Sequence, residues 1–461
     1  MPQTERCREI AINKVTNLTE GSCVRGLVEL ALPIFIGSLI QQLYNTVDLM
    51  FVAKLLGKEA AASVGSCGML IACILGFFTG LSVGVAIVAG NAFGAGNFHR
   101  LKRLVHTGAG LTLSMGGVML VISIIMAPTF LKWMNVPESI LPMSTEYLRV
   151  YLLSLFSIIG YNIGAGFLRA LGNSRTPMLY QLYGGIANVA GNTLFIYVLD
   201  LGIFGAASAT FLSQSVAAFL TIREICRLDE RYRLRFREIC LDRRICRDIL
   251  KIGIPSAVQS MVISFSNTLV QSEINLLGVD TIAAFSGYFK EENFVYLPII
   301  SFGQANMSFF AQNSGAGLTD RAKRGTKLSI IIGVIITLAI STALTLGHKH
   351  VFALFTDDPA VMAIGWQVVK MTIPFYFLYV FLEVLSSAIR GAGHAFPPMV
   401  IVLLNSCVLR LILLKAVMYI MPTASAVASV YPLTWATNTI CFVIYYKYGH
   451  WDRPARRLNA F

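Results

Sequence analysis

Charged residues are scarce in this sequence: only 13% of the chain is Asp, Glu, Lys or Arg, whereas 56% is hydrophobic and the mean hydropathy is +0.68. A water-soluble domain carries roughly 25% charged residues, because its surface must be hydrated. A chain with about half that share cannot cover itself in water, so much of its surface must face lipid. This composition excludes soluble enzymes, disordered proteins and disulfide-stapled secreted domains.

The motifs of catalytic and nucleotide-binding sites are missing as well. There is no HExxH, no GxSxG, no Walker loop and no cluster of carboxylates and histidines with metal-ligand spacing. The nine cysteines form no CxxC pair, so we expect them to be reduced and structural. The six histidines all lie in or beside expected loops. We therefore expect neither an enzyme nor a protein that holds a metal or an organic cofactor.

Hydrophobic stretches long enough to cross a bilayer, about 20 residues each, recur along the chain. We expect twelve membrane-spanning helices, at 27–52, 60–90, 104–130, 140–168, 177–199, 203–224, 252–277, 281–312, 327–347, 362–388, 397–420 and 423–447. The two longest stretches, 60–90 and 281–312, are expected to include a re-entrant or loop portion. The fold class is therefore all-α integral membrane.

The chain repeats itself at an offset of about 221 residues. At this shift Gly57 meets Gly278, and Gly94-Ala95-Gly96 meets Gly315-Ala316-Gly317. Further pairs at the same shift are Arg100 with Arg321, Arg169 with Arg390, Gly172 with Gly393 and Pro177-Met178 with Pro398-Met399. Each half then holds six spans in the same orientation, which is a parallel repeat around an axis along the membrane normal. We expect two pseudo-symmetric six-helix lobes.

These counts define the expected organisation of the chain. A cytoplasmic N-terminal segment (1–26) precedes the N-lobe (27–224), a basic cytoplasmic linker (225–251) leads to the C-lobe (252–447), and a basic cytoplasmic tail (448–461) follows. Of the 37 Lys and Arg residues, 28 fall in segments that this scheme places inside and four in outer loops. The asymmetry predicts that both termini are cytoplasmic and that the net charge of +13 reflects topology rather than nucleic-acid binding.

Two pseudo-symmetric lobes are the usual build of alternating-access carriers, whose substrate site lies between the repeats. The repeated motifs resemble those of the multidrug and toxic compound extrusion (MATE) transporters over essentially the full length. In the first half the resembling residues are Pro33, Gln41-Gln42-Leu43-Tyr44-Asn45, Asp48, Leu56-Gly57, Gly94-Ala95-Gly96, Arg100, Leu168-Arg169, Gly172, Pro177, Gly205-Ala206-Ala207 and Thr210. In the second half they are Gln312-Asn313, Gly315-Ala316-Gly317, Arg321, Ile389-Arg390-Gly391 and Gly393.

The resemblance is greatest to the bacterial and archaeal branch with an aspartate in the first helix. It implies efflux of organic, often cationic, compounds in exchange for protons or sodium ions. It also implies that Asp48 lies beside polar residues of the fifth span. There this sequence has Asn188 and Asn192, where similar proteins have an Asn and an Asp. The departure leaves one carboxylate where two would share a proton or bind sodium.

Ionisable groups inside a membrane are costly and commonly mark ion or substrate pathways. Asp48 follows Tyr44 and Asn45 by about one helical turn, and Asn188 and Asn192 share one face of their helix. We predict an ion-coupling site of Asp48, Asn188 and Asn192, completed by Thr210. Gln41, Tyr44 and Asn45 would be polar residues of the cavity. The alternative is that Asp48 only hydrogen-bonds Asn188 and locks the lobe.

The second half carries more buried charge. Glu273, Lys290, Glu292 and Arg410 are expected between mid-membrane and the outer third, so we predict a charge network with Lys290 paired to Glu273 and Arg410 to Glu292. The remaining members of this network are Glu291, Lys415 and Glu383, the last one nearer the inside. This network either binds the cationic substrate or a proton, or only holds the C-lobe together. Because Asp48 has amide neighbours rather than cations, it ranks first as the titrating group.

The function expected from the sequence is a secondary active multidrug antiporter of the plasma (inner) membrane that works by rocking of two lobes. The coupling ion is H⁺ or Na⁺, which Asp48 could bind; we favour protons. Its partners would be small amphiphilic or cationic drugs and the lipid bilayer, and we expect a monomer. Alternatives are a flippase for lipid-linked or other amphiphiles, which would have a larger basic cavity, and a non-transporting membrane protein.

Overall fold

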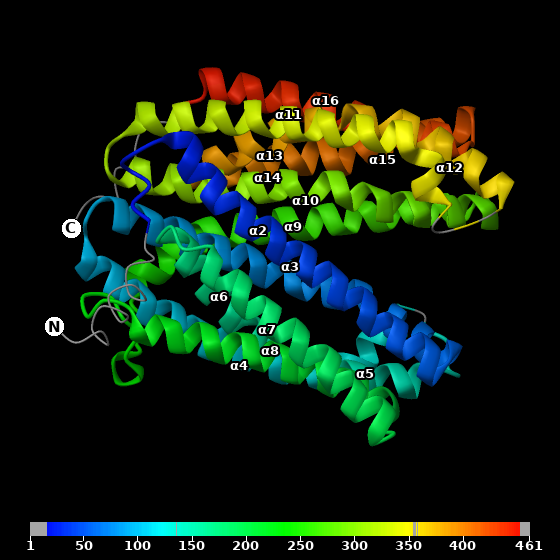
Figure 1. The fold of residues 1–461 in the computed structure, drawn as a ribbon, viewed down its shortest axis with the longest axis horizontal. Coiled ribbons are helices and arrows are strands. Elements are labelled where there is room, and N and C mark those ends of the chain that lie inside the picture. The colour runs from blue at the N-terminus through cyan, green and yellow to red at the C-terminus, as the bar shows by residue number, and fades with distance from the viewer. Residues whose placement is uncertain (1–15, 135, 354–355, 357, 452–461) are drawn as a thin grey trace. The chain divides into compact units, whose positions relative to one another are not determined.

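A computed structural model describes residues 16–134, 136–353, 356 and 358–451, and every regular element in these ranges is a helix. The expected all-α fold is therefore confirmed (Figure 1). The first half contains α2 (Cys23–Phe51), α3 (Lys58–Gly94), α4 (Phe98–Trp133), α5 (Leu141–Leu153), α6 (Leu155–Ala170), α7 (Arg175–Asn192) and α8 (Gly202–Arg227). The second half contains α9 (Arg243–Asn275), α10 (Val279–Gly315), α11 (Thr319–Phe352), α12 (Pro359–Thr372), α13 (Tyr376–Gly391), α14 (Phe396–Val402), α15 (Arg410–Ile420) and α16 (Ala424–Tyr448).

Most of the expected spans are long apolar helices. Within the described ranges, ten helices are long and apolar enough to cross a membrane, and the bent pair α5 and α6, which meet at 41°, makes an eleventh span. The twelfth expected stretch, 177–199, is formed by α7 and a π-helical turn, Thr193–Val198. This segment is helical but less apolar, because it carries Gln181, Asn188 and Asn192.

The expectation of a re-entrant portion in the two longest stretches was wrong. α3 and α10 are each one continuous helix of 37 residues. A helix rises 1.5 Å per residue, so each is far longer than the roughly 30 Å hydrocarbon core. A continuous helix of this length can cross the membrane without a loop within it.

The internal repeat is visible in the helix boundaries. α3 ends at Gly94 and α10 at Gly315, and the helices that follow begin at Phe98 and Thr319, so both pairs keep the offset of 221. Three pairs of glycines at the same offset have positive φ: Gly57 (86°) with Gly278 (96°), Gly96 (67°) with Gly317 (76°), and Gly172 (82°) with Gly393 (92°). Residues that carry a side chain rarely adopt a positive φ, so the repeated glycines mark turns that both halves share.

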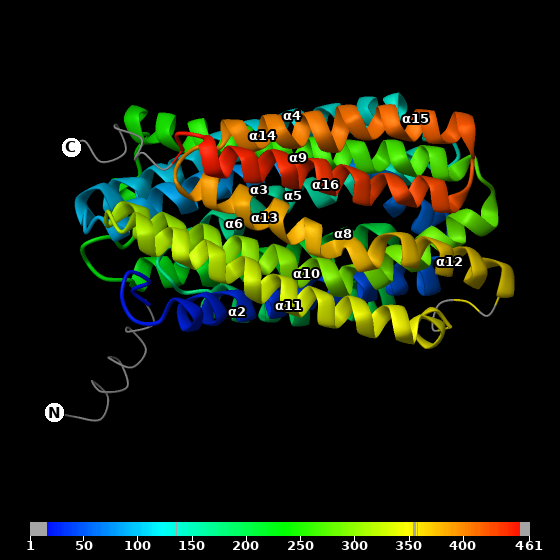
Figure 2. The same ribbon diagram turned by 90° about the horizontal axis from the view of Figure 1, so that it is seen from above.

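The helices form two compact units, one built around Leu32–Ile254 and the other from Pro255 onward together with Leu18–Ala31. In the first unit α8 packs along α7 and α6, and α3 packs along α6. In the second unit α10 packs along α11 and α13, and α13 along α16 (Figure 2). The buried core of the second unit is rich in aromatic residues, including Tyr288, Tyr376 and Trp435.

The unit boundaries fall inside two helices, each next to a proline. α2 changes unit just before Pro33, and α9 changes unit at Pro255. Segment 27–31, expected in the N-lobe, therefore groups with the second unit, and residues 252–254, expected in the C-lobe, group with the first. Most of the N-terminal segment and of the C-terminal tail, with Arg6, Arg8, Lys14 and Arg457, lies outside the described residues.

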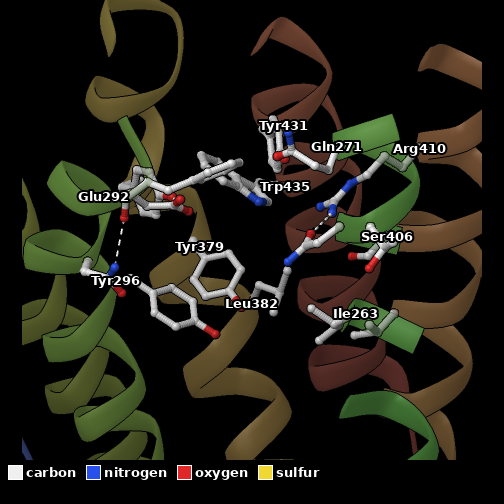
Figure 3. A pocket seen from close by; sticks show the side chains of 16 residues that line it. Ile263, Gln271, Glu292, Tyr296, Tyr379, Leu382, Ser406, Arg410, Tyr431 and Trp435 are labelled. Atoms are coloured by element: carbon white, nitrogen blue, oxygen red, sulfur yellow. Dashed lines mark hydrogen bonds between the residues drawn. The ribbon is translucent and has the colours of Figure 1, made fainter. Parts of the chain in front are cut away.

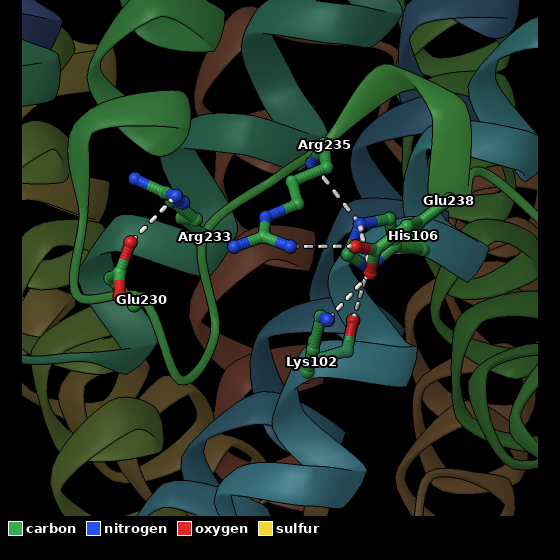
Figure 4. A network of polar contacts seen from close by, with 6 residues as sticks. All are labelled: Lys102, His106, Glu230, Arg233, Arg235 and Glu238. Atoms are coloured by element: carbon green, nitrogen blue, oxygen red, sulfur yellow. Dashed lines mark hydrogen bonds and ion pairs between the residues drawn. The ribbon is translucent and has the colours of Figure 1, made fainter.

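The expected linker, 225–251, is an ordered segment attached to α4. Lys102 contacts Glu238 at 2.6 Å, and Arg235 donates its backbone N–H to His106 Nε2 at 3.1 Å (Figure 4). The other ring nitrogen, Nδ1 of His106, lies 2.7 Å from the Lys102 carbonyl oxygen. Arg103 pairs with Asp242, whose carboxylate also accepts from the backbone N–H groups at the start of α9.

Candidate functional site

The first candidate site lies within the first unit, where α2 faces α7. Asn192 donates from Nδ2 to Asp48 Oδ1 at 2.7 Å and to Asn188 Oδ1 at 3.2 Å. Both asparagines are buried, 1% and 0% exposed. Their spacing of four residues puts them on one helical face, as the sequence indicated. The structure thus brings together three of the four residues predicted for ion coupling.

Thr210, the fourth residue of that prediction, bonds elsewhere. Its hydroxyl donates to the carbonyl oxygen of Ala206, one turn earlier on α8, at 3.4 Å. This back-bond is common for threonine in helices, where the hydroxyl competes for the backbone acceptor. Thr210 therefore does not complete the hydrogen bonds around Asp48.

A second polar group lies one turn along α2. The Tyr44 hydroxyl accepts from Gln181 Nε2 at 3.0 Å and from Gln214 Nε2 at 3.2 Å, and all three side chains are buried. Gln41 and Asn45, also predicted for the cavity, are exposed. The two glutamines were not among the site residues predicted from the sequence. A signal was available, because Gln181 lies seven residues before Asn188 and so shares its helical face.

The pairings predicted for the charge network of the second unit were wrong. Glu273 is paired with Lys415, at 2.5 Å, rather than with Lys290. Arg410 donates to Asn267 Oδ1 at 3.1 Å, to Ser266 Oγ at 3.5 Å and to Thr434 Oγ1 at 3.4 Å. Helix register alone does not fix which side chain of a neighbouring helix lies nearest, and that is why the partners could not be derived.

Glu292 and Arg410 nevertheless belong to one site. Both line a cavity of about 450 Å³ inside the second unit, and the ion pairs of the described residues do not include a pair between them (Figure 3). Glu292 accepts a hydrogen bond from the Tyr376 hydroxyl, and the Arg410 guanidinium lies over the Tyr431 ring, 5.0 Å from its centroid. The aromatic residues of the lining are Phe289, Tyr296, Tyr376, Tyr379, Tyr431 and Trp435.

Two other carboxylates of the predicted network have basic partners outside this cavity. Glu291 Oε2 lies 3.3 Å from Nδ1 of His348, and Glu383 pairs with Arg390 at 3.2 Å. His348, expected in or beside a loop, is in α11, 2% exposed, with its ring 4.7 Å from that of Phe352 and 5.3 Å from that of Trp366. The expected span ended at 347, whereas the helix runs on to Phe352.

In the part of the chain that the structure describes, no three side chains of His, Cys, Asp or Glu come together to hold a metal ion. The Asp48 site has one carboxylate and two carboxamides. The cavity of the second unit has one carboxylate, Glu292.

Known proteins share this sequence pattern and fold. The family model MatE matches twice, at residues 33–194 and 255–414, once in each half of the repeat. The probable multidrug resistance protein YoeA of Bacillus subtilis is 28% identical over 378 residues, which cover 80% of this chain and 81% of YoeA. The probable multidrug resistance protein NorM of Thermotoga maritima is 24% identical, over 84% of this chain and 83% of NorM.

Solved structures agree on the fold. An outward-facing multidrug resistance MATE family transporter of the MOP superfamily superposes with a TM-score of 0.86 at 24% identity, covering 95% of this chain and 97% of that one. A MOP superfamily transporter from Pyrococcus furiosus gives a TM-score of 0.84 over the same shares of the two chains. The doubled family match covers more than half of the sequence, and the helices repeat with it. This chain is a multi-pass membrane protein of the MATE transporter family.

Proposed function

We propose that this protein exports small amphiphilic and cationic organic compounds across the plasma membrane in exchange for protons, with Asp48 as the coupling group. The relatives named as multidrug resistance proteins support the substrate class. The coupling role is supported by the surroundings of Asp48. Its carboxylate lies in a membrane-spanning helix and accepts a hydrogen bond from a buried amide. It takes part in none of the ion pairs of the described residues.

A proton suits these surroundings better than sodium. Sodium needs several oxygen ligands, whereas Asn192 presents its amide nitrogen to Asp48. The carboxylate can take up a proton without a second charge, because a carboxamide can donate to the ionised form and accept from the protonated one. Uptake of the proton removes a charge from the membrane-spanning part of the first unit, which favours a different state of the lobe.

The substrate would be bound by the cavity of the second unit. Its volume falls in the range of roughly 300–1,000 Å³ that drug-sized ligands occupy. Aromatic rings with a carboxylate suit organic cations, which are attracted to ring faces. The lining contains one cationic side chain, Arg410, which is fewer than the anionic headgroup of a lipid-linked sugar would need. The single cationic side chain therefore favours drug export over transport of lipid-linked compounds by a flippase.

The remaining parts of the proposal concern topology and mechanism. The protein would be a monomer with both termini in the cytoplasm, and rocking of its two lobes would open it alternately to the two sides of the membrane. The matched pairs of glycine turns with positive φ give both halves similar connections, in keeping with two repeated lobes that rock against each other. The basic segment between α8 and α9 would lie on the cytoplasmic side.

The test is drug flux in proteoliposomes with an imposed proton or sodium gradient, for wild type and Asp48→Asn. We expect flux driven by the proton gradient alone, and at least a tenfold loss in Asp48→Asn. Thr193→Val is the matched control, since Thr193 directly follows Asn192 but is exposed, and its hydroxyl donates to the backbone carbonyl oxygen of Val189. Flux driven only by sodium would change the ion, and proton-driven flux that survives Asp48→Asn would remove Asp48 from the mechanism.

A further inference from the structure

Arg410 is a buried cation that makes no direct ion pair with a described carboxylate. Its side chain is on α15, and the residue is 4% exposed. Its guanidinium donates hydrogen bonds to three neutral oxygens, of Ser266, Asn267 and Thr434, and its Nε has no hydrogen-bond partner among the described residues. Leaving a buried charge without a direct ionic partner is strongly unfavourable. A site that keeps such a group commonly uses it on a ligand.

Glu292 is the matching anion on α10. Its carboxylate accepts from Tyr376, a neutral donor, and forms no ion pair with any described residue. The cavity therefore holds one carboxylate and one guanidinium that are not paired with each other. In Figure 3 Glu292 and Arg410 lie on opposite sides of the cavity, with Tyr379 and Trp435 between them.

The rings between the two charges form an aromatic cluster. Trp435 lies 4.5 Å from Tyr376 and 5.8 Å from Tyr379, measured between ring centroids. Tyr379 in turn lies 5.6 Å from Tyr296. Such ring faces bind flat apolar bodies and exclude water, so a charge at either end of the cavity acts in a weakly screened environment.

We infer that this cavity selects zwitterionic aromatic amphiphiles: flat molecules with an amine at one end, held by Glu292, and a carboxylate at the other, held by Arg410. A ligand with only one charge would leave the opposite group of the protein buried without its partner, at a cost in affinity. A zwitterion satisfies both groups and brings no net charge into the lobe. The inference rests on the proposed function and narrows its substrate class.

The test uses four ligands that differ only in charge. A piperazinyl fluoroquinolone is zwitterionic, its ethyl ester is a cation, its N-acetyl derivative is an anion, and the doubly blocked compound is neutral. Binding to the full chain in nanodiscs is measured by titration of the quinolone fluorescence, with no gradient. We expect wild type to bind the zwitterion at least tenfold more tightly than each of the other three ligands.

The variants assign each end of the ligand. In Arg410→Gln the zwitterion should lose its advantage over the ester, and in Glu292→Gln its advantage over the N-acetyl compound. Lys415→Gln removes a cation from the same helix outside the cavity and should leave the order unchanged. Arg410→Lys keeps the charge and should keep the preference for the zwitterion even if Arg410→Gln folds poorly.

Three results would overturn the inference. One is equal binding of the four compounds to wild type. The second is a uniform loss of affinity for all four ligands in Arg410→Gln. The third is no change in either variant, which would put the ligand elsewhere. Binding is measured without a gradient, so it is independent of transport. Absence of proton-driven flux would contradict the proposed function and leave the preference for the zwitterion standing. Proton-driven flux without that preference would contradict this inference and leave the proposed function standing.

Discussion

Asn192 donates the same amide nitrogen to Asp48, at 2.7 Å, and to Asn188, at 3.2 Å, while its own Oδ1 is buried without a hydrogen-bond partner. A carboxamide turned by half a rotation presents its oxygen instead of its nitrogen. Asn192 can therefore donate to the ionised carboxylate and accept from the protonated one. An aspartate at this position could donate to an ionised Asp48 only while it was itself protonated.

Replacing this amide tests its part in coupling. Asn192→Leu keeps the volume of the side chain and removes the donor and the acceptor. We expect proton-driven flux to fall about tenfold, which corresponds to about 1.4 kcal/mol, the size of one hydrogen bond to a charged group. Flux is measured in the same proteoliposomes with Thr193→Val as control. Undiminished flux in Asn192→Leu would make the amide a packing residue.

The Tyr44 hydroxyl is the shared acceptor of Gln181 and Gln214, so its removal should destabilise the first unit. We expect Tyr44→Phe to lower the free energy of unfolding by about 1–3 kcal/mol, because two buried amides lose their acceptor. Adding Gln214→Leu should recover part of the loss, since one unpaired donor is then gone. Thermal unfolding in detergent reports both effects. Tyr419→Phe, at a tyrosine that is 91% exposed, is the control and should be neutral.

Glu291 and His348 form a buried pair 3.3 Å apart, so their energetic coupling can be measured. Each single substitution, Glu291→Met or His348→Phe, should cost about 3–5 kcal/mol if it leaves the other group buried alone. The double variant should cost clearly less than the two singles combined. A double-mutant cycle from denaturant unfolding gives the coupling. Additivity within about 0.5 kcal/mol would mean that the contact contributes no energy of its own.

The segment that joins the two halves should detach at low pH. The hydrogen bond from Lys102, with the nearby Arg235, holds the pKa of Glu238 below its usual range. Burial raises the pKa of Asp242, but the N–H groups of Ile245 and Arg244 and the Arg103 guanidinium together hold it below its usual range.

The sign follows from these lowered pKa values. Each ionised carboxylate stabilises the attached segment above its ordinary pKa, about 4, and this contribution is lost as the pH falls through the lowered value. Amide hydrogen exchange over 229–242, corrected for the intrinsic effect of pH, should therefore increase below about pH 4. In Lys102→Gln the exchange should already be faster at neutral pH and depend less on pH. Exchange that is unchanged between pH 6 and pH 3 would show that these ion pairs do not hold the segment.

The helices and the repeat could be predicted because they depend on patterns local in the chain. Lipid requires every backbone group to be satisfied within its own segment, so a long apolar stretch indicates a helix without knowledge of its neighbours. The glycine turns could be found for the same reason, since Gly57 and Gly278 reveal themselves by recurring at one offset. The grouping of Asp48 with Asn188 and Asn192 came from helical periodicity and the resemblance to the family.

The partners of the charges depended on tertiary structure alone. Lys290 and Lys415 are both basic residues expected at a similar depth to Glu273, and only the packing of α9 against its neighbours decides that Lys415 is the one in contact. In the same way, the sequence contained Glu292, Arg410 and the aromatic residues, but only the packing of the helices places them around one cavity. A helical pattern specifies which face a side chain takes, whereas the rotation and offset of each helix against its neighbours decide what that side chain meets.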